Sequence, residues 1–313
     1  MTVRQLITIL LFIVSTAQAQ ERYEFSAVKL GTLCKIIFYA PDSAFAHSAS
    51  QKAWKKIDEL NEILSDYNEN SEIRRLADSS GMGRKIQVSK VLYDIIEHSL
   101  EFSRLSKGAF DITIGSYVQL WRRARRQAVF PTQEQLAKAK KATGYQKIKL
   151  YPKQQSVKLK AKGMRLDVGG IGKGFIADEV LKLLDSMGIS AGIVDLGGDI
   201  SISNAPPQQE GWRIETGYKD KAGLFVSREL SLKNCAVATS GDLYQFVSIG
   251  GKRYSHIINP KTGIGLTEMG QVTVIAPNGT AADALASAVS VLGKRKGMKL
   301  AQKLKNITLL LLD

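Results

Sequence analysis

The chain has 313 residues, of which 44% are hydrophobic, enough to bury a sizeable core and too many for a largely disordered protein. Its net charge of +15 favours polyanionic ligands, but much of the excess lies in two short stretches, 122–126 and 138–141. We interpret most of these charges as a solvated face, and we do not expect nucleic acid as a partner because the chain begins like an exported protein.

Residues 1–19 have the pattern of an export signal. Arg4 precedes an apolar run at 6–14, and the small-x-small triplet at 17–19 matches a cleavage site. The run is too short to span a bilayer comfortably, and no cysteine near the cleavage site indicates a lipid anchor. An uncleaved signal anchor is the alternative. We expect residues 20–313 to be exported to the bacterial periplasm, peripheral to the membrane, as one domain or as two intimately packed halves.

Apolar alternation marks the predicted strands, and a period of 3.6 residues marks the predicted helices. The predicted elements are a strand over 28–40, helices over 46–64, 71–73 and 91–105, a hairpin at 148–150 and 157–159, a helix over 176–187, strands over 192–196, 199–203, 211–215, 226–232, 235–239, 254–258 and 271–276, a helix over 281–292 and a final strand over 307–312. Between them, residues 109–121 are less regular, and the basic stretch 122–141 is predicted to be a surface helical excursion. This mixture, without regular βαβ alternation, favours an α+β fold with largely antiparallel sheets.

The segment 167–175, DVGGIGKGF, carries the densest chemical signal. Its four glycines let the backbone approach a ligand closely, and the helix that follows presents an N-terminus that favours phosphate. The segment matches neither GxxxxGK[ST] nor GxGxxG, and a tight strand-to-helix turn would also use its glycines. Lys173 adds a positive charge and favours the phosphate-binding interpretation.

Asp283 and Ser287 stand four residues apart in the last predicted long helix, so their side chains lie on one face. A carboxylate and a hydroxyl are hard oxygen ligands that suit Mg²⁺, which completes its coordination with waters or substrate phosphates. Thr280 and Asp283 also form a TxxD capping box, so Asp283 has a structural alternative. Spacing alone supports the two interpretations equally.

Three further features leave alternatives open. His256 precedes an Asn-Pro turn in the segment 254–263, where it is either a general base near neutral pH or a structural residue. The glycine pair at 197–198 is interpreted as a hairpin turn. Cys34 and Cys235 lie far apart in sequence, which leaves open whether they form a disulfide or remain separate thiols.

Seven segments in this order resemble the ApbE family of FAD:protein FMN transferases, from the predicted strand at 30–32 to the helix at 281–293. The matching segments are LSDY at 64–67 with SEI at 71–73, GAFD at 108–111, DVGGIGKG at 167–174, LGGD at 196–199, ATSGD at 238–242, YSHIINPKTG at 254–263 and ADA at 282–284. No single segment is decisive, but all of them in register are very specific.

The resemblance implies an α+β fold that holds FAD in a cleft, with Mg²⁺ at its pyrophosphate. It implies transfer of FMN from FAD to a threonine of an acceptor protein, such as a flavin-bearing subunit of a membrane redox complex, with release of AMP. Carried over by position, the metal ligands would be Asp283, Ser287 and the Gly170 carbonyl, the base would be His256, and FAD would contact Leu30, Tyr67, Ala109, Phe110, Asp111, Asp167, Lys173 and Ile257.

The chain departs from the family pattern at a few positions. Leu30 stands where methionine is common, and Ser287 stands where threonine or alanine is common; these residues keep an apolar contact and a hydroxyl ligand. The basic cluster at 122–126 matches no family motif. The same site residues would also serve an FAD pyrophosphatase, in which water replaces threonine. A periplasmic flavin-binding carrier without turnover is a further alternative.

Overall fold

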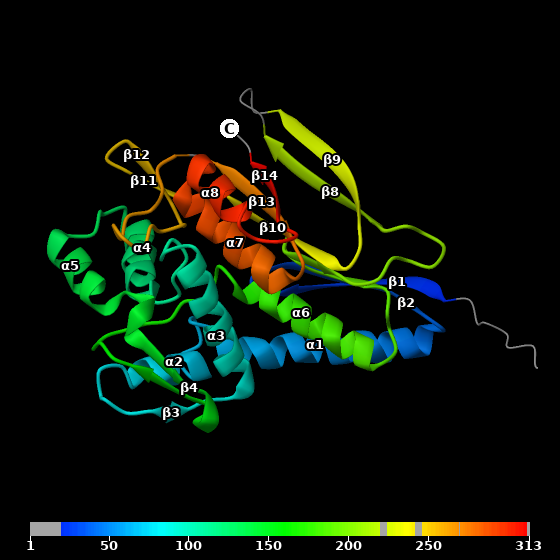
Figure 1. The fold of residues 1–313 in the computed structure, drawn as a ribbon, viewed down its shortest axis with the longest axis horizontal. Helices are drawn as coiled ribbons and strands as arrows, with labels where there is room; N and C mark the ends of the chain where they lie inside the picture. Colours follow the sequence, from blue (N-terminus) through cyan, green and yellow to red (C-terminus); the bar gives the residue numbers. More distant parts are fainter. Residues whose placement is uncertain (1–19, 220–223, 242–245, 269, 312–313) are drawn as a thin grey trace, which may run out of the picture.

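The computed structural model describes residues 20–219, 224–241, 246–268 and 270–311 (Figure 1). The predicted export signal at 1–19 lies outside these residues, as do Asp242 of the ATSGD segment and Leu312 of the predicted final strand. Within the described residues, no helix has the length and apolar character needed to cross a membrane.

Antiparallel pairing builds the central sheet. Within the described chain its strands, in spatial order, are β1 (Glu21–Lys29), β2 (Thr32–Ala40), β6 (Gly192–Leu196), β7 (Ile200–Ile202), β10 (Cys235–Gly241), β13 (Gln271–Ala276) and β14 (Thr308–Leu311). Every neighbouring pair is antiparallel, which confirms the expected α+β class. The order also separates Cys34 on β2 from Cys235 on β10 by two strands, and both cysteines are free thiols.

Helices cover one face of this sheet. The helices are α1 (Ser43–Leu64), α2 (Glu72–Asp78), α3 (Lys90–Leu105), α4 (Gly115–Gln127), α5 (Gln133–Ala142), α6 (Gly172–Ser186), α7 (Gly279–Leu292) and α8 (Lys294–Ala301), with 3₁₀ turns η1 (Tyr145–Lys147) and η2 (Pro152–Gln154). α1, α6 and α7 lie over the sheet, with α7 against β10 and β13 and α6 against β6 (Figure 1). α6 and α7 also pack on each other. This contact places the segment 167–175, called the glycine-rich loop below, beside the start of α7.

The opposite face is covered by a hairpin of β8 (Trp212–Lys219) and β9 (Phe225–Leu232). Trp212 packs there with Ile193 of β6, and its ring centroid lies 5.8 Å from that of Tyr39. Because the sheet is covered on both faces, β6 and β13 are buried at successive positions and do not alternate between buried and exposed.

The first predicted strand is wrong in its extent. β1 and β2 form a hairpin with a two-residue turn at Leu30-Gly31, and both residues have positive φ, at 54° and 74°. Glycine accepts this conformation, whereas leucine is strained in it because its Cβ approaches the backbone. Apolar alternation runs through the turn and hides it in the sequence. Leu30 therefore lies at the tip of a hairpin.

A second, smaller sheet lies beside α2 (Figure 1). Its strands are β3 (Ile86–Gln87), β4 (Ile148–Tyr151) and β5 (Ser156–Leu159), in the order β3-β5-β4. The antiparallel pairing of β4 with β5 confirms the hairpin predicted ahead of the glycine-rich loop.

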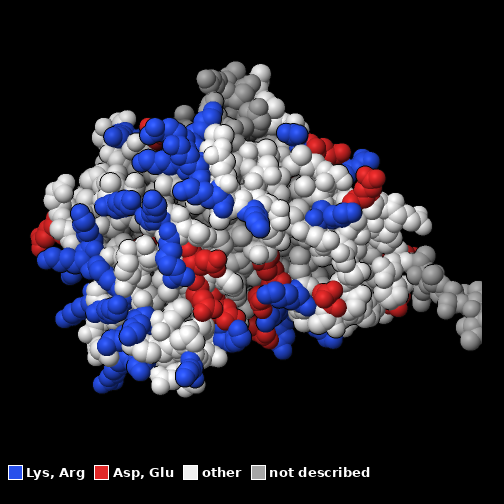
Figure 2. Space-filling view, viewed as in Figure 1, with Lys and Arg blue, Asp and Glu red and all other residues white. Residues whose placement is uncertain are grey.

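A separate apolar cluster holds the basic part of the chain. Residues 109–121 were expected to be irregular, but α4 begins within them, at Gly115. The expectation is therefore wrong for residues 115–121. Trp121 of α4 packs with Ile258 and with the hairpin of β11 (Phe246–Ile249) and β12 (Lys252–Ser255). Figure 2 shows Lys and Arg side chains gathered over the end of the molecule where α4 and α5 lie. The basic excursion is therefore helical, as predicted, and its inner side is apolar.

Candidate active site

A cavity of about 520 Å³ opens between the α6–α7 pair, the β1–β2 turn and α4. It brings together every residue that the sequence analysis assigned to the site: Leu30, Tyr67, Ala109, Phe110, Asp111, Asp167, Gly170, Lys173, His256, Ile257, Asp283 and Ser287. These residues come from a hairpin turn, from the loops after α1, α3 and β12, from the glycine-rich loop and from α7. The tertiary fold, and not proximity in the sequence, therefore assembles the site.

The glycine-rich loop and α7 meet at a close crossing. A Cβ added to Gly174 would overlap the backbone carbonyl of Gly279, so helix packing itself requires a glycine here. The same contact brings the N-terminus of α6 to Asp283, whose Oδ2 accepts a hydrogen bond from the Gly174 N–H at 3.2 Å. A backbone group that the sequence analysis expected to bind phosphate thus binds a protein carboxylate.

Asp283 does not cap α7. The N-cap of this helix is Asn278, whose side chain accepts a hydrogen bond from the Ala281 N–H at 2.8 Å. Thr280 instead donates its hydroxyl to Asp178 of α6 at 2.6 Å. The capping-box alternative is therefore wrong, and Asp283 lies one turn inside the helix with its side chain on the cavity wall.

Lys173 lies between two carboxylates. Its Nζ is 2.5 Å from Oδ2 of Asp199, and Asp283 is near enough to interact with its charge. Burial raises the pKa of Asp283 well above its usual value and Asp199 raises it further, while Lys173 and the α6 backbone N–H groups lower it. Burial lowers the pKa of Lys173, but Asp199 and Asp283 outweigh this effect and raise it. With all three groups ionised the cluster has a net negative charge, which a cation would offset.

Gly170 and Ser287 are held against each other in the same cavity. A Cβ added to Gly170 would lie 2.6 Å from Oγ of Ser287, so this approach requires glycine. Ser287 stands one turn after Asp283 on α7, so a carboxylate, a hydroxyl and a backbone segment lie close together. No three His, Cys, Asp or Glu side chains of the described chain cluster as a metal site, so an ion here would depend on mixed oxygen ligands.

The Asp111 carboxylate lines the cavity and is also held by hydrogen bonds from Thr113 and Tyr145. Its Oδ1 accepts hydrogen bonds from the Thr113 N–H at 2.8 Å and the Thr113 hydroxyl at 2.7 Å, and its Oδ2 accepts one from the Tyr145 N–H at 2.9 Å. Burial raises the pKa of Asp111, and these hydrogen bonds lower it. The carboxylate therefore ties the segment after Phe110 to η1.

His256 follows β12 in a loop held by backbone hydrogen bonds. The Ser255 N–H donates to the Leu266 carbonyl at 2.7 Å, and the Leu266 N–H donates to the Ile257 carbonyl at 2.9 Å. Nε1 of Trp121 on α4 donates to the carbonyl of a glycine in the same loop at 2.8 Å. His256 is half-buried on the cavity wall, where a ligand can reach it, as a general base requires.

Known proteins share this arrangement of elements. The sequence profile of the ApbE family matches residues 30–311. The chain belongs to the ApbE family. It is 31% identical over 302 residues to the FAD:protein FMN transferase of Treponema pallidum, with 91% of this chain and 83% of that protein covered.

Further ApbE-family relatives give the same result. The FAD:protein FMN transferase of Escherichia coli K12 is 28% identical over 279 residues, which cover 88% of this chain and 79% of that protein. The flavin transferase ApbE of Vibrio cholerae superposes with a TM-score of 0.85, at 28% identity and 94% coverage of both chains. These matches confirm the expected family, the α+β fold and the expectation of a transferase enzyme.

Arg122 of this ApbE-family chain also lines the cavity, although it was expected among the surface charges. Nη1 of Arg122 pairs with Oδ2 of Asp66 at 2.6 Å, and Nη2 lies 3.5 Å from Oδ2 of Asp167. The guanidinium lies 3.8 Å from the centre of the Tyr67 ring. The interpretation as a solvated face is therefore wrong for Arg122. Its partners are remote in sequence, so no local pattern reveals its role.

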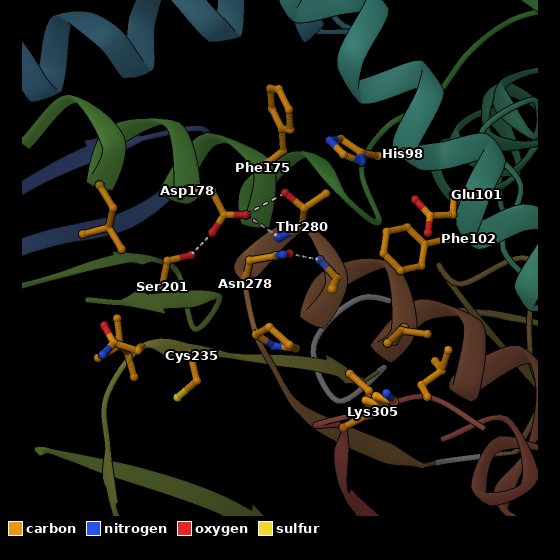
Figure 3. Close-up of a pocket in the computed structure, with 18 of the residues that line it drawn as sticks. His98, Glu101, Phe102, Phe175, Asp178, Ser201, Cys235, Asn278, Thr280 and Lys305 are labelled. Atoms are coloured by element: carbon orange, nitrogen blue, oxygen red, sulfur yellow. Dashed lines mark hydrogen bonds between the residues drawn. The ribbon is translucent and has the colours of Figure 1, made fainter. Parts of the chain in front are cut away.

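A second cavity of the ApbE-family chain, about 690 Å³, is lined by α3, α6, the start of α7 and the segment after α8. None of the predicted site residues lines it. Figure 3 shows Asp178 at its wall, where the carboxylate accepts hydrogen bonds from the Ser201 hydroxyl at 2.8 Å and from the Thr280 hydroxyl at 2.6 Å. Asp178 also accepts from the N–H groups of Gly279 and Thr280, at 2.7 and 2.8 Å. It thereby fixes the start of α7 on α6 and positions Asp283 one turn later.

Proposed function

We propose that this protein transfers FMN from FAD to a threonine hydroxyl of an acceptor protein and releases AMP, with Mg²⁺ at the pyrophosphate. The observation that carries this proposal is one cavity that joins the Lys173, Asp199 and Asp283 cluster to His256. The names of the relatives, FAD:protein FMN transferases, support FAD as the donor.

The cavity offers both kinds of contact that FAD needs. Leu30, Tyr67, Phe110 and Ile257 present apolar and aromatic surface for its rings. Lys173 supplies a positive charge for the pyrophosphate. We infer that FAD binds with its pyrophosphate beside Lys173 and with its rings against the apolar residues.

The residues around Asp283 fit a magnesium ion. The cluster has two buried carboxylates and one lysine, and a glycine at position 170 leaves room for close approach to the Ser287 hydroxyl. Asp283, Ser287 and the Gly170 carbonyl would hold the ion, and water or pyrophosphate oxygens would complete its coordination. When bound, the ion would offset the negative charge that builds on the pyrophosphate during transfer.

The remaining residues perform the chemistry as follows. His256 accepts the proton of the acceptor threonine hydroxyl. The threonine oxygen attacks the FMN phosphorus and forms the new phosphoester bond, while the bond from that phosphorus to the bridging oxygen breaks and AMP leaves. Lys173, held by Asp199, keeps a positive charge beside the pyrophosphate oxygens as their negative charge increases.

We also propose where the protein works. Its first residues, 1–19, have the pattern of an export signal, and residues 20–313 would act as one domain in the periplasm, peripheral to the membrane. The acceptor would be a flavin-bearing subunit of a membrane redox complex, presented on the same side of that membrane. A fusion of residues 1–19 to a reporter enzyme that is active only after export tests the first of these statements.

The central test incubates the mature protein with FAD and Mg²⁺, with and without a flavin-acceptor domain that carries the target threonine. Acceptor mass and released AMP are measured. We expect an acceptor heavier by one FMN residue, with one AMP released for each, and no product in EDTA. AMP without a change in acceptor mass would replace the proposal with FAD hydrolysis. FAD that is bound but stays intact would replace the proposal with a flavin-binding carrier without turnover.

Ser287→Ala and Ser290→Ala form a matched pair of variants on α7. Ser290 donates to the Ala286 carbonyl at 2.9 Å and does not line the cavity. If Ser287 is a metal ligand, its loss should raise the Mg²⁺ concentration for half-maximal activity by about tenfold, and the Ser290 variant should behave as wild type. Equal Mg²⁺ dependence in the two variants would remove Ser287 from the ligand set.

A further inference from the structure

Arg122 occupies a position unlike that of its basic neighbours. It projects from α4 into the cavity wall, and its side chain is only 23% exposed. Arg125 also lines the cavity but is exposed, and Arg123 and Arg126 are exposed and do not line it. The helix that carries it is held in place by Trp121, which is buried in the apolar cluster under α4. The position of the guanidinium is therefore set by the fold.

Three groups of the cavity wall meet at this guanidinium. Asp66 is bound at 2.6 Å and Asp167 at 3.5 Å, and both carboxylates are largely buried. The Tyr67 ring lies over the guanidinium at 3.8 Å, while the tyrosine as a whole is 77% exposed. Arg122 thus joins the loop after α1 to the first residue of the glycine-rich loop and supports one face of an aromatic ring.

We propose that Arg122 is a positioning residue for FAD binding, which holds the Tyr67 ring and the Asp167 carboxylate where each contacts the substrate. The inference rests on the proposed function, because it takes FAD as the ligand of this cavity. With one ring face supported by Arg122, the other face of Tyr67 is open to stack an aromatic ring of FAD. Asp167, which contacts Nη2 of the guanidinium and lines the cavity, provides an acceptor for a polar edge of the ligand.

A lysine could not replace this arginine. The planar guanidinium contacts two carboxylates and stacks on a ring at the same time, whereas an ammonium is a point charge on a flexible stem. Arg122→Lys should therefore recover only the part of binding that depends on positive charge. This partial recovery distinguishes positioning by shape from a general electrostatic effect.

The experiment measures FAD affinity without turnover and then activity. Flavin fluorescence in EDTA gives the FAD dissociation constant, and AMP release with Mg²⁺ and the acceptor domain gives KM and kcat for FAD. Arg122→Gln should raise the dissociation constant and KM by about tenfold or more, with kcat changed by less than about threefold. Arg122→Lys should fall between this variant and wild type. Arg123→Gln, an exposed neighbour on the same helix, is the matched control and should match wild type.

A second variant keeps the test informative if Arg122→Gln folds poorly. Asp66→Asn removes one arm of the contact and should raise KM in the same direction. In the double variant with Arg122→Gln the two losses should not add, because both act through one contact. AMP and FMN, the two halves of FAD, are used as competitors to find which half of FAD depends on Arg122. The half that depends on it should bind more weakly to Arg122→Gln than to the wild type.

Three results would overturn the inference. One is an unchanged FAD dissociation constant and an unchanged KM in Arg122→Gln. Another is a lower kcat and a lower melting temperature of this variant with no change in FAD affinity, which would indicate a structural role. A third is that Arg122→Gln binds AMP as tightly as the wild type does and also binds FMN as tightly as the wild type does. If the wild-type protein itself does not bind FAD, the proposed function fails. If the wild type binds and the variant binds equally, only the role of Arg122 fails.

Discussion

Asp178 and Asp283 are carboxylates on neighbouring helices, and their surroundings differ. Asp178 accepts four hydrogen bonds, from Ser201 and from the first residues of α7. Asp283 is 6% exposed and accepts a hydrogen bond from the Gly174 N–H. Its pKa is raised by burial and by the nearby Asp199 carboxylate. One carboxylate lies at the wall of the second cavity, and the other lies in the candidate active site.

The difference separates a structural carboxylate from one that suits a ligand. Hydrogen bonds from the chain satisfy the oxygens of Asp178, so this group stabilises the folded state. Burial and a second carboxylate leave the charge of Asp283 poorly compensated, so the group favours a bound cation.

The largest effect is expected on catalysis at Asp283. Asp283→Asn keeps the size of the side chain and removes its charge, so the rate of FMN transfer should fall by about 100-fold or more. The free energy of unfolding at pH 7 should stay the same or rise, because an ionised carboxylate is unfavourable in this environment. Acceptor mass against time and urea denaturation measure the two quantities. A variant that loses stability but keeps its rate would reverse the roles of the two carboxylates.

The next largest effect is expected on stability at Asp178. Asp178→Ala leaves the N–H groups of Gly279 and Thr280 without their acceptor, so the free energy of unfolding should fall by about 3 kcal/mol. Asp178→Asn should cost less, because an amide oxygen still accepts. Urea denaturation measures both losses. If the alanine variant is as stable as wild type, Asp178 does not anchor α7.

A smaller loss is expected from the helix crossing that brings Asp283 to α6. Gly174→Ala adds a methyl group that overlaps Gly279, so the free energy of unfolding should fall by about 1 to 3 kcal/mol. Gly172→Ala is the matched control, because its Cβ would meet only the Val168 side chain, at 3.6 Å or more. The control should change stability by less than about 1 kcal/mol. If thermal denaturation shows equal losses of stability in Gly174→Ala and Gly172→Ala, the helix crossing is not the reason that residue 174 is glycine.

The smallest effect is a pH dependence from Asp167. Burial and the neighbouring Asp66 raise the pKa of Asp167, whereas the Gly169 N–H and Arg122 lower it. The raising effects are larger, and the pKa of Asp167 is raised to about 6. The folded state therefore keeps a proton that the unfolded chain releases between about pH 4 and pH 6. The free energy of unfolding should fall as the pH rises through this window, by about 1 to 2 kcal/mol.

Asp167→Asn isolates this contribution. Urea denaturation between pH 4 and pH 6, in EDTA so that no metal ion takes part, should show a weaker fall in stability with pH in the variant than in the wild type. The matched substitution Asp185→Asn, on an exposed position of α6, should leave the dependence as in the wild type. An identical pH dependence of Asp167→Asn and wild type would show that Asp167 has an ordinary pKa.

Helices with one strongly apolar face could be predicted from the sequence. The helices expected over 46–64, 91–105 and 281–292 correspond to α1, α3 and α7, because burial of one side imposes the helical period. α6 was expected to begin at residue 176 but begins at Gly172, because glycines carry no apolar pattern in its first turn. The residues that meet in the candidate active site were located by family motifs, and not by periodicity.

Features that depend on contacts between distant segments could not be predicted. Arg122 looked like one charge in a basic run, since its partners Asp66 and Asp167 lie in other loops. The role of Asp178 depends on the start of α7, which is remote in the sequence. The turn at 30–31 was hidden because apolar alternation continues through it. In each case the deciding partner is set by the tertiary fold.

The most direct test of the comparison assays Asp283→Asn and Asp178→Asn side by side. Each variant is incubated with FAD, Mg²⁺ and the acceptor domain, the acceptor mass is measured, and the rate is normalised to the folded fraction from circular dichroism. We expect an FMN adduct with wild type and with Asp178→Asn, and almost none with Asp283→Asn, which should melt no earlier than wild type. An adduct formed by Asp283→Asn at the wild-type rate would contradict the assignment of Asp283 to the active site.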